Sequence, residues 1–392
     1  MARKKHVKWR HKPIFALARL VGFFMALRYG YKKNVYPLKK KQYFILSNHQ
    51  TLLDPPLLAF NFRAPVYFIA SDTLWNGTFV SKLLQFCFAP IKKRKAMTDV
   101  ACIRTCLRVA KEGGNIALFP EGNRSWADTP LYIDPAICKF VRMLKLPLLL
   151  HRFEGGFGVD PRWCGSLRRG PFKGYVAKEL STEEIDRMSD EELYEVIVKT
   201  LYVEDCKSGN LYKSKRRAEF LERLLFVCPC CHSLSTLRSE GNQIHCSHCE
   251  LSVTYEENLS LSSERPDFPF HTLSEWASFQ KQTVKNLKDK KESVSLCDEN
   301  VRLYDKTQEK RALMEEGTMT LTEKALSLGS FSVPTADITG ATVVGGTQLV
   351  INTDEKSYSF FGSKRFNPIK YMLFFHILDT KMQDDKYYGL SD

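Results

Sequence analysis

The sequence lacks an apolar run long enough to cross a membrane. A spanning helix needs about 20 consecutive apolar residues, and the best candidate, residues 14–27, is shorter and is interrupted by Arg19 and Gly22. No small-residue cleavage site follows this run, so the sequence does not predict a secretory signal either. We therefore expect a protein that does not span the bilayer.

Acidic residues are absent from the first twelve positions, which hold six Lys or Arg residues. The apolar run that follows contains Phe15, Phe23 and Phe24, and a second basic group lies at residues 28–41. A basic arm beside an aromatic, apolar stretch is typical of a helix lying in the surface of an anionic membrane. The alternative is a helix packed on the protein, with its cations simply solvated.

The cysteine pairs lack the surrounding basic and aromatic residues that are typical of a nucleic-acid reader. The formal net charge of +14 predicts an anionic partner, and charge alone does not distinguish nucleic acid from a lipid surface. Because the dense basic and aromatic pattern is missing, we expect membrane phospholipids as partners and no nucleic acid.

A disulfide framework is not predicted, although the chain has 12 cysteines. Four of them form two C-x2-C pairs separated by fourteen residues, a spacing that is typical of a zinc ribbon in a reducing cytosol. Four ligands leave no open coordination position, which favours a structural Zn²⁺ over a catalytic one. The expected ligands are Cys228, Cys231, Cys246 and Cys249. Cys230 is left over, and His232, His245 and His248 are possible substitutes of lower rank.

The first motif that carries chemistry is residues 48–54, Asn-His-Gln-Thr-Leu-Leu-Asp. It follows residues 42–47, an apolar run that predicts a buried strand. We expect Asp54 to be the N-cap of a helix with Pro55 at its first position. His49 then lies in a loop, where the Asp54 carboxylate can reach its imidazole and stabilise the protonated ring of a general base. The alternative is a loop histidine beside a plain capping aspartate.

The second motif is residues 119–125, Phe-Pro-Glu-Gly-Asn-Arg-Ser, at the end of another predicted strand. It places a carboxylate, small or polar residues and an arginine on a turn at a strand end, where α/β proteins bind ligands. Arg124 has the planar guanidinium group that suits phosphate.

Together these segments resemble the paired NHxxxxD and FPEGTRS motifs of the glycerolipid acyltransferases, in particular the 1-acylglycerol-3-phosphate acyltransferases. The resemblance covers residues 10–180, and Asn123 stands where the family usually has threonine. Residues 89–94 resemble the family motif in which an apolar run ends in a basic residue, without showing whether Lys92, Lys93 or Arg94 is equivalent.

The resemblance implies acyl transfer from a thioester donor, either acyl-CoA or acyl carrier protein. His49 would take the proton of the acceptor hydroxyl, and Asp54 would hold the ring and offset its charge. A thioester is already activated, which agrees with the lack of any serine or cysteine in the context of a nucleophile. The acceptor would be bound by Glu121, Gly122, Asn123 and Arg124, with Lys92, Lys93 or Arg94 adding positive charge.

The expected function is transfer of a fatty acyl group to 1-acylglycerol 3-phosphate, giving phosphatidic acid for phospholipid synthesis. The protein would act as a peripheral protein on the cytoplasmic face of a membrane. The alternatives are an acyltransferase for another lysolipid, a zinc-ribbon factor that binds nucleic acid or protein, and a lipid-binding scaffold without catalysis.

Strand-like runs alternate with helical patterns between residues 42 and 178, which predicts a layered α/β domain with a mixed sheet. Helical patterns are also expected at residues 181–206, 213–226 and 273–290. Short β runs between residues 294 and 361, followed by a helix at residues 367–381, resemble a pleckstrin-homology-like or GRAM-like domain. The expected parts are a membrane-surface arm (1–41), the acyltransferase domain (42–205), a linker helix (206–227), the zinc ribbon (228–260), a second linker helix (261–291) and the β-rich domain (292–392).

Overall fold

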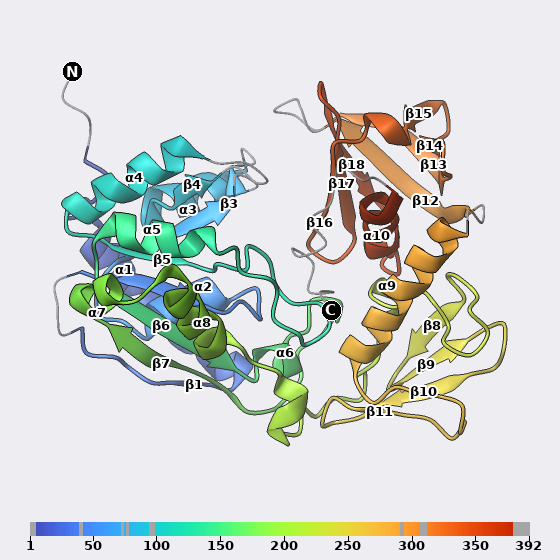
Figure 1. The fold of residues 1–392 in the computed structure, drawn as a ribbon, viewed down its shortest axis with the longest axis horizontal. Helices are drawn as coiled ribbons and strands as arrows, with labels where there is room; N and C mark the ends of the chain where they lie inside the picture. Colours follow the sequence, from blue (N-terminus) through green and yellow to red (C-terminus); the bar gives the residue numbers. More distant parts are fainter. Residues whose placement is uncertain are drawn as a thin grey trace. The chain divides into compact units, whose positions relative to one another are not determined.

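The structure is a computed structural model, and it describes residues 5–38, 42–71, 74–75, 78–93, 99–290, 294–305 and 312–378. The chain folds into two compact units (Figure 1). The first unit contains Met1–Arg124, Pro130–Asp160 and Arg169–Asp205, and the second contains Ser125–Thr129, Pro161–Arg168 and Cys206–Asp392. The finer six-part division of the chain stays a prediction.

A seven-stranded sheet with strand order β1-β7-β6-β2-β5-β3-β4 forms the centre of the first unit. β6 and β7 pair antiparallel and the other neighbours pair parallel, so the predicted mixed sheet is confirmed. The strands are β1 (Tyr31–Lys33), β2 (Phe44–Ser47), β3 (Val66–Ser71), β4 (Ile91–Lys93), β5 (Asn115–Leu118), β6 (Leu148–Glu154) and β7 (Phe172–Leu180).

The helices of the first unit are α1 (His11–Tyr29), α2 (Asp54–Phe60), α3 (Phe79–Phe88), α4 (Val100–Lys111), α5 (Ala136–Leu144), α6 (Gly156–Val159), α7 (Thr182–Arg187) and α8 (Asp190–Leu201). Alternate side chains of β2 and β6, such as Phe44 and Leu148, pack in one buried cluster with residues of α4, α5 and α8. The intervening Ile45 and Leu149 are buried as well. Both sides of β2 and of the first half of β6 are therefore buried, which explains the apolar runs at residues 44–46 and 148–150.

Within the described residues, no helix combines the length and the apolar character needed to cross a bilayer. α1 is the longest helix of the first unit, and it ends at Gly30, which has the positive φ of 62° expected for a glycine after a helix.

The second unit contains two antiparallel sheets. The smaller has strand order β11-β10-β9-β8 and consists of β8 (Leu237–Glu240), β9 (Gln243–Cys246), β10 (Ser252–Tyr255) and β11 (Leu261–Ser262). Helix α9 (Leu273–Asp289) follows it and matches the helix expected at residues 273–290.

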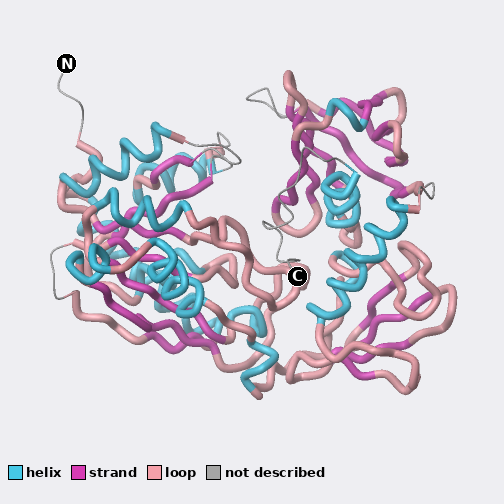
Figure 2. Tube along the Cα trace, in the orientation of Figure 1, coloured by secondary structure: helices cyan, strands magenta, loops and turns pink. Residues whose placement is uncertain are grey.

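The larger sheet has strand order β15-β14-β13-β12-β18-β17-β16. Its strands are β12 (Leu296–Asp305), β13 (Leu313–Leu321), β14 (Ala325–Leu328), β15 (Phe331–Pro334), β16 (Gly340–Val344), β17 (Gln348–Asn352) and β18 (Ser357–Phe361). Helix α10 (Pro368–Leu378) packs on β16 and β17, as Figure 2 shows by secondary structure. A β-rich C-terminal region with one final helix is thus confirmed, and its relation to pleckstrin-homology-like domains stays a prediction.

The helix expected at residues 213–226 is wrong. Within this fully described stretch the structure has one helical turn, the 3-10 turn Leu221–Arg223. The guanidinium groups of Arg217 and Arg223 are largely buried and donate to backbone carbonyls of distant segments. These tertiary hydrogen bonds outweigh a local helix propensity that is worth only tenths of a kcal/mol per residue.

β12 begins at the last residue of one expected β run, 294–296, and contains the whole of the next, 301–304. β12 has an irregularity between Asp298 and Val301 where its pairing with β13 shifts. A bulge of this kind interrupts the alternation of apolar side chains, so a single strand has the sequence pattern of two. Strands β15 and β16 were not expected from the sequence.

Candidate active site and metal centre

The loop at residues 48–53, here the His49 loop, connects β2 to α2. At its start the buried side chain of Asn48 pairs with the backbone of Phe153 in β6. The Asn48 Nδ2 donates to the Phe153 carbonyl oxygen at 2.9 Å, and its Oδ1 accepts from the Phe153 N–H at 2.7 Å. The His49 Nδ1 then lies 2.8 Å from Asp54 Oδ2. The structure therefore brings the two side chains into contact, and their catalytic role stays a prediction.

The sequence predicted Asp54 as the N-cap of helix α2, and this prediction is wrong. The helix begins at Asp54 itself, with Leu53 at the N-cap position and no side-chain cap. The fully buried carboxylate turns back toward the loop, where Oδ2 accepts from the N–H groups of Gln50 at 2.6 Å and Thr51 at 2.9 Å. Its Oδ1 accepts from the Thr51 hydroxyl at 2.5 Å. Because these donors satisfy the carboxylate, the loop is fixed around the group that contacts His49.

The imidazole of His49 stacks on the ring of Phe119, with 4.3 Å between the ring centroids and 24° between the planes. Phe119 follows β5, the strand next to β2. The His49 side chain keeps 19% of its surface exposed, whereas Asp54 is fully buried. With Nδ1 bound to Asp54, Nε2 is the ring nitrogen that can exchange a proton with a substrate.

Glu121 joins the second motif to the first. Its Oε1 accepts from the His49 N–H at 3.1 Å, and its Oε2 accepts from the Leu131 N–H at 3.1 Å. The side chain is buried, and this burial raises the pKa of Glu121 to about 8, against the opposing effect of the two hydrogen bonds. The Glu121 side chain, which was expected to bind substrate, therefore links the His49 loop to the segment at Leu131 through hydrogen bonds. Its contact with substrate stays a prediction.

The rest of the turn at residues 119–125, here the Arg124 turn, is more open. Gly122 has a φ of +69°, and among the described residues no atom beyond its own chain neighbours lies within 4 Å of the position where a Cβ would stand. Asn123 Oδ1 accepts from the N–H of Arg124 at 3.2 Å. The Arg124 Nη1 lies 3.8 Å from Asp160 Oδ2, which also accepts from the N–H of Leu52 at 3.4 Å. Arg124 thus lies beside the His49 loop.

The comparisons with known proteins cover the part of the chain that holds both motifs. Residues 11–153 match the family model described as acyltransferase. Over these residues the chain is similar to the acyltransferase family. The resemblance inferred from the two motifs is thereby confirmed, and residues 11–153 are called the acyltransferase domain below.

Two relatives illustrate the likeness. Over 88 residues the chain is 28% identical to a protein of Borreliella burgdorferi named 1-acyl-sn-glycerol-3-phosphate acyltransferase. This match covers 22% of the chain and only 35% of that relative. A solved structure of the 1-acyl-sn-glycerophosphate (LPA) acyltransferase PlsC from Thermotoga maritima aligns with a TM-score of 0.42 and 20% identity, over 49% of this chain and 78% of that chain.

Lys92 and Lys93 lie in the acyltransferase domain at the end of β4, the edge strand of the sheet. Because β2, β5, β3 and β4 run parallel, these lysines share the carboxyl edge of the sheet with the His49 loop and the Arg124 turn. The Lys92 Nζ lies 5.6 Å from the Trp75 ring. Arg94, the third candidate, lies outside the described residues.

The sequence reasoning gave no role to three residues of the site: Gln50, Asp160 and Asp205. The Gln50 Oε1 accepts from the Gly156 N–H at 2.9 Å, and its Nε2 donates to Asp205 Oδ2 at 3.4 Å. Asp160 contacts both the loop and the Arg124 turn. Gln50 occupies a position inside the first motif, but its partners are more than one hundred residues away, so no local pattern signals them.

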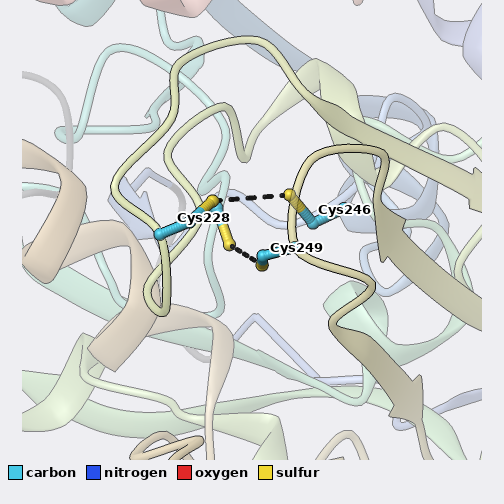
Figure 3. Close-up of side chains that lie close together, drawn as sticks. Cys228, Cys246 and Cys249 are labelled. Carbon is cyan, nitrogen blue, oxygen red and sulfur yellow. Dashed lines mark hydrogen bonds between the residues drawn. The ribbon is translucent and has the colours of Figure 1, made fainter.

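The second unit brings together the four cysteines expected to bind zinc. Their sulfur atoms all lie within 4.8 Å of one another (Figure 3 labels three of these cysteines). The Cys228 and Cys249 sulfurs are 3.5 Å apart, and those of Cys231 and Cys246 are 3.7 Å apart. Four thiolates around a tetrahedral Zn²⁺ with bonds of about 2.3 Å would stand about 3.8 Å apart, so the residues fit this metal. Cys230 is not a member of the group.

Proposed function

We propose that this chain transfers a fatty acyl group from a thioester donor to the free hydroxyl of 1-acylglycerol 3-phosphate, which gives phosphatidic acid. The observation that carries the proposal is the 2.8 Å contact of His49 Nδ1 with the buried Asp54 carboxylate, at a loop that also lies beside Arg124. The name of the Borreliella burgdorferi relative supports the choice of acceptor.

The reaction follows from these positions. Nε2 of His49 takes the proton of the acceptor hydroxyl as its oxygen attacks the thioester carbonyl. A C–O bond forms, the C–S bond breaks, and the departing thiolate receives the proton from the imidazolium. Asp54 offsets the charge of the ring and fixes its orientation through Nδ1. The guanidinium group of Arg124 binds the acceptor phosphate, and Lys92 or Lys93 adds positive charge at the same edge of the sheet. The donor is acyl-CoA or acyl carrier protein.

We further propose that the acyltransferase domain rests on the cytoplasmic face of a membrane through an apolar face formed by α1 and α3. One side of α1 is buried, at Phe15 and Ala26, and the other side is exposed. The two helices are in contact. Large exposed patches of this kind mark interaction surfaces, and the neighbouring basic residues suit an anionic leaflet. The apolar face consists of Leu17, Leu20, Phe23, Phe24 and Leu27 of α1 and Phe79, Leu83 and Phe86 of α3.

The cysteine group supports a second, structural proposal. Cys228, Cys231, Cys246 and Cys249 would hold one Zn²⁺ as thiolates, with no coordination position left for substrate. The metal would cross-link the segment before β8, which holds Cys228 and Cys231, to the end of β9 and the turn after it, which hold Cys246 and Cys249. It would supply folding free energy to this part of the chain.

A panel of lysolipids and thioester donors, with products identified by mass spectrometry, tests the proposed reaction. We expect acylation of 1-acylglycerol 3-phosphate and weaker acylation of lysolipids without a terminal phosphate. A different preferred acceptor would correct the substrate, and no acyl transfer with any pair would favour a lipid-binding scaffold. Salt-dependent binding of DNA or RNA without acyl transfer would favour a zinc-ribbon factor instead.

A further inference from the structure

We propose that the carboxylate of Asp160 occupies the anion site of the acyltransferase domain in the absence of substrate and competes with the acceptor phosphate for Arg124. This inference rests on the proposed function, because it assumes that Arg124 binds the phosphate of the acceptor. It adds an internal competitor and two further hydrogen-bond donors for the phosphate, the Tyr29 hydroxyl and the Leu52 N–H.

A single oxygen of Asp160 gathers donors from three separate segments. Oδ2 accepts from the Tyr29 hydroxyl at the end of α1 at 3.4 Å and from the Leu52 N–H in the His49 loop at 3.4 Å. The Arg124 Nη1 lies 3.8 Å from the same atom. A hydroxyl, a backbone N–H and a guanidinium group that converge on one oxygen are the kinds of donor that bind a phosphate oxygen.

The carboxylate fits this site loosely. Charge-assisted N–H···O bonds are usually about 2.7–2.9 Å long, and Asp54 at the start of α2 has contacts of 2.5 to 2.9 Å. All three contacts of Asp160 Oδ2 are longer. Burial raises the pKa of Asp160, and the attraction of Arg124 does not cancel this effect. The charged carboxylate is therefore under-compensated where it lies, so a larger anion with more oxygens can replace it.

The position of the site suits the acceptor. Leu52 is in the same loop as His49, and Arg124 is in the same turn as Glu121, whose Oε1 accepts from the His49 N–H. A phosphate held by Leu52, Arg124 and Tyr29 would thus lie on the loop that presents the imidazole. Asp160 is anchored through its N–H to the Gly156 carbonyl at 2.9 Å, so rotation of its side chain is enough to open the site.

Binding of glycerol 3-phosphate to the full-length protein, measured by calorimetry, tests this inference directly. Asp160→Asn keeps the shape of the side chain and removes its charge, so we expect the dissociation constant to fall about tenfold. The matched control is Asp190→Asn, which also removes a carboxylate paired with an arginine but outside the site, and it should leave the constant unchanged. An unchanged or higher constant in Asp160→Asn would show that the carboxylate orients Arg124 instead of competing for it.

Tyr29→Phe is a second variant that keeps the inference testable if Asp160→Asn folds poorly. Removal of the hydroxyl should weaken glycerol 3-phosphate binding about threefold to tenfold, since one hydrogen bond to a charged group is lost. Unaltered binding would exclude Tyr29 from the site. In turnover, Asp160→Asn should lower the KM for 1-acylglycerol 3-phosphate by a larger factor than the KM for monoacylglycerol, which has no phosphate. Absence of all acyl transfer in the unmodified protein would refute the proposed function, whereas the binding experiment would still decide the role of Asp160.

Discussion

At the scale of single residues, two acidic side chains of the site, Asp54 and Glu121, differ in the hydrogen bonds that they accept. Asp54 is satisfied by short hydrogen bonds from the His49 loop, and Glu121 braces that loop against the Arg124 turn. Glu121 is buried and its pKa is raised to about 8, so it holds a proton more tightly in the folded chain than in the unfolded one. This difference links the stability of the site to pH.

The first prediction concerns this link. Between about pH 4.5 and pH 8 the folded protein keeps the Glu121 proton that the unfolded chain releases, so stability falls as the pH rises. The loss amounts to at most about 1.4 kcal/mol per pH unit. In Glu121→Gln this contribution disappears, so the free energy of unfolding should depend less on pH than in the unmodified protein. Urea unfolding at pH 5.5 and pH 8 measures the difference, with the exposed Glu195→Gln as control. If the free energy of unfolding depended equally on pH in Glu121→Gln and in the unmodified protein, Glu121 would not be the buried, protonated group assumed here.

Residue-scale contacts were predictable only where they are local. The contact of His49 with Asp54 spans five residues, and the loop-then-helix pattern predicted it. The cap expected at Asp54 was wrong because the carboxylate has better partners in its own loop than at the helix start. The contact of Glu121 with His49 and the contacts of Asp160 with Leu52 and Tyr29 join segments 72 to 131 residues apart, and no spacing in the sequence encodes them.

At the scale of elements, strands buried on both faces were the easiest to predict. β2, β5 and β6 are short apolar runs at nearly the expected positions. The helix expected at residues 213–226 failed because buried arginines there find carbonyl partners elsewhere in the second unit. For α1, periodicity could not decide between a packed and a membrane-bound helix. The structure gives it one buried side and one exposed apolar side.

The second prediction concerns the exposed side of α1. Burying a large apolar side chain contributes roughly 1.5–3 kcal/mol, so Leu20→Glu with Phe24→Glu should weaken binding to anionic vesicles more than tenfold, and high salt should not mask the loss. Both side chains are more than half exposed, so the fold should tolerate the change. Vesicle flotation at low and high salt provides the measurement. The control is Leu313→Glu, an equally exposed residue of the second unit. Undiminished flotation of the double variant would show that α1 is not the anchor.

At the scale of the whole molecule, the two units differ in what stabilises them. The first has a sheet covered by helices, with one large apolar cluster. In the second, α9 and α10 contact each other and the segment before the small sheet. The Trp276 Nε1 donates to the Val227 carbonyl at 2.9 Å, and Lys370 Nζ donates to Ser235 Oγ at 3.1 Å. Both acceptors lie next to the cysteine group, so the metal proposed there would support more than the ribbon itself.

The third prediction follows from these contacts. Purified reduced protein should contain one zinc per chain, and its removal by a chelator should increase hydrogen exchange in β8, β9 and α9 while the strands of the first unit stay protected. Cys246→Ser should reproduce this pattern, and Cys230→Ser, outside the group, should not. Zinc-free protein with the same exchange protection would refute a structural metal.

The architecture of the two units could be predicted only in outline. Composition and the paired cysteines predicted a ribbon and a β-rich end, and both motifs of the acyltransferase domain were recognisable from the sequence. Strands β15 and β16 were missed because they are short and only partly apolar, with exposed or half-buried positions in each. A sheet edge needs little apolar surface, so its strands leave a weak pattern.

The rate of acyl transfer by His49→Ala tests the central claim most directly. Product formation from 1-acylglycerol 3-phosphate and an acyl thioester, followed by mass spectrometry, compares this variant with the unmodified protein and with His271→Ala, a histidine of the second unit. Loss of the general base should slow turnover about 10²- to 10⁴-fold, while hydrogen exchange of the acyltransferase domain and glycerol 3-phosphate binding stay unchanged. Near-full activity in a folded His49→Ala protein would contradict the mechanism.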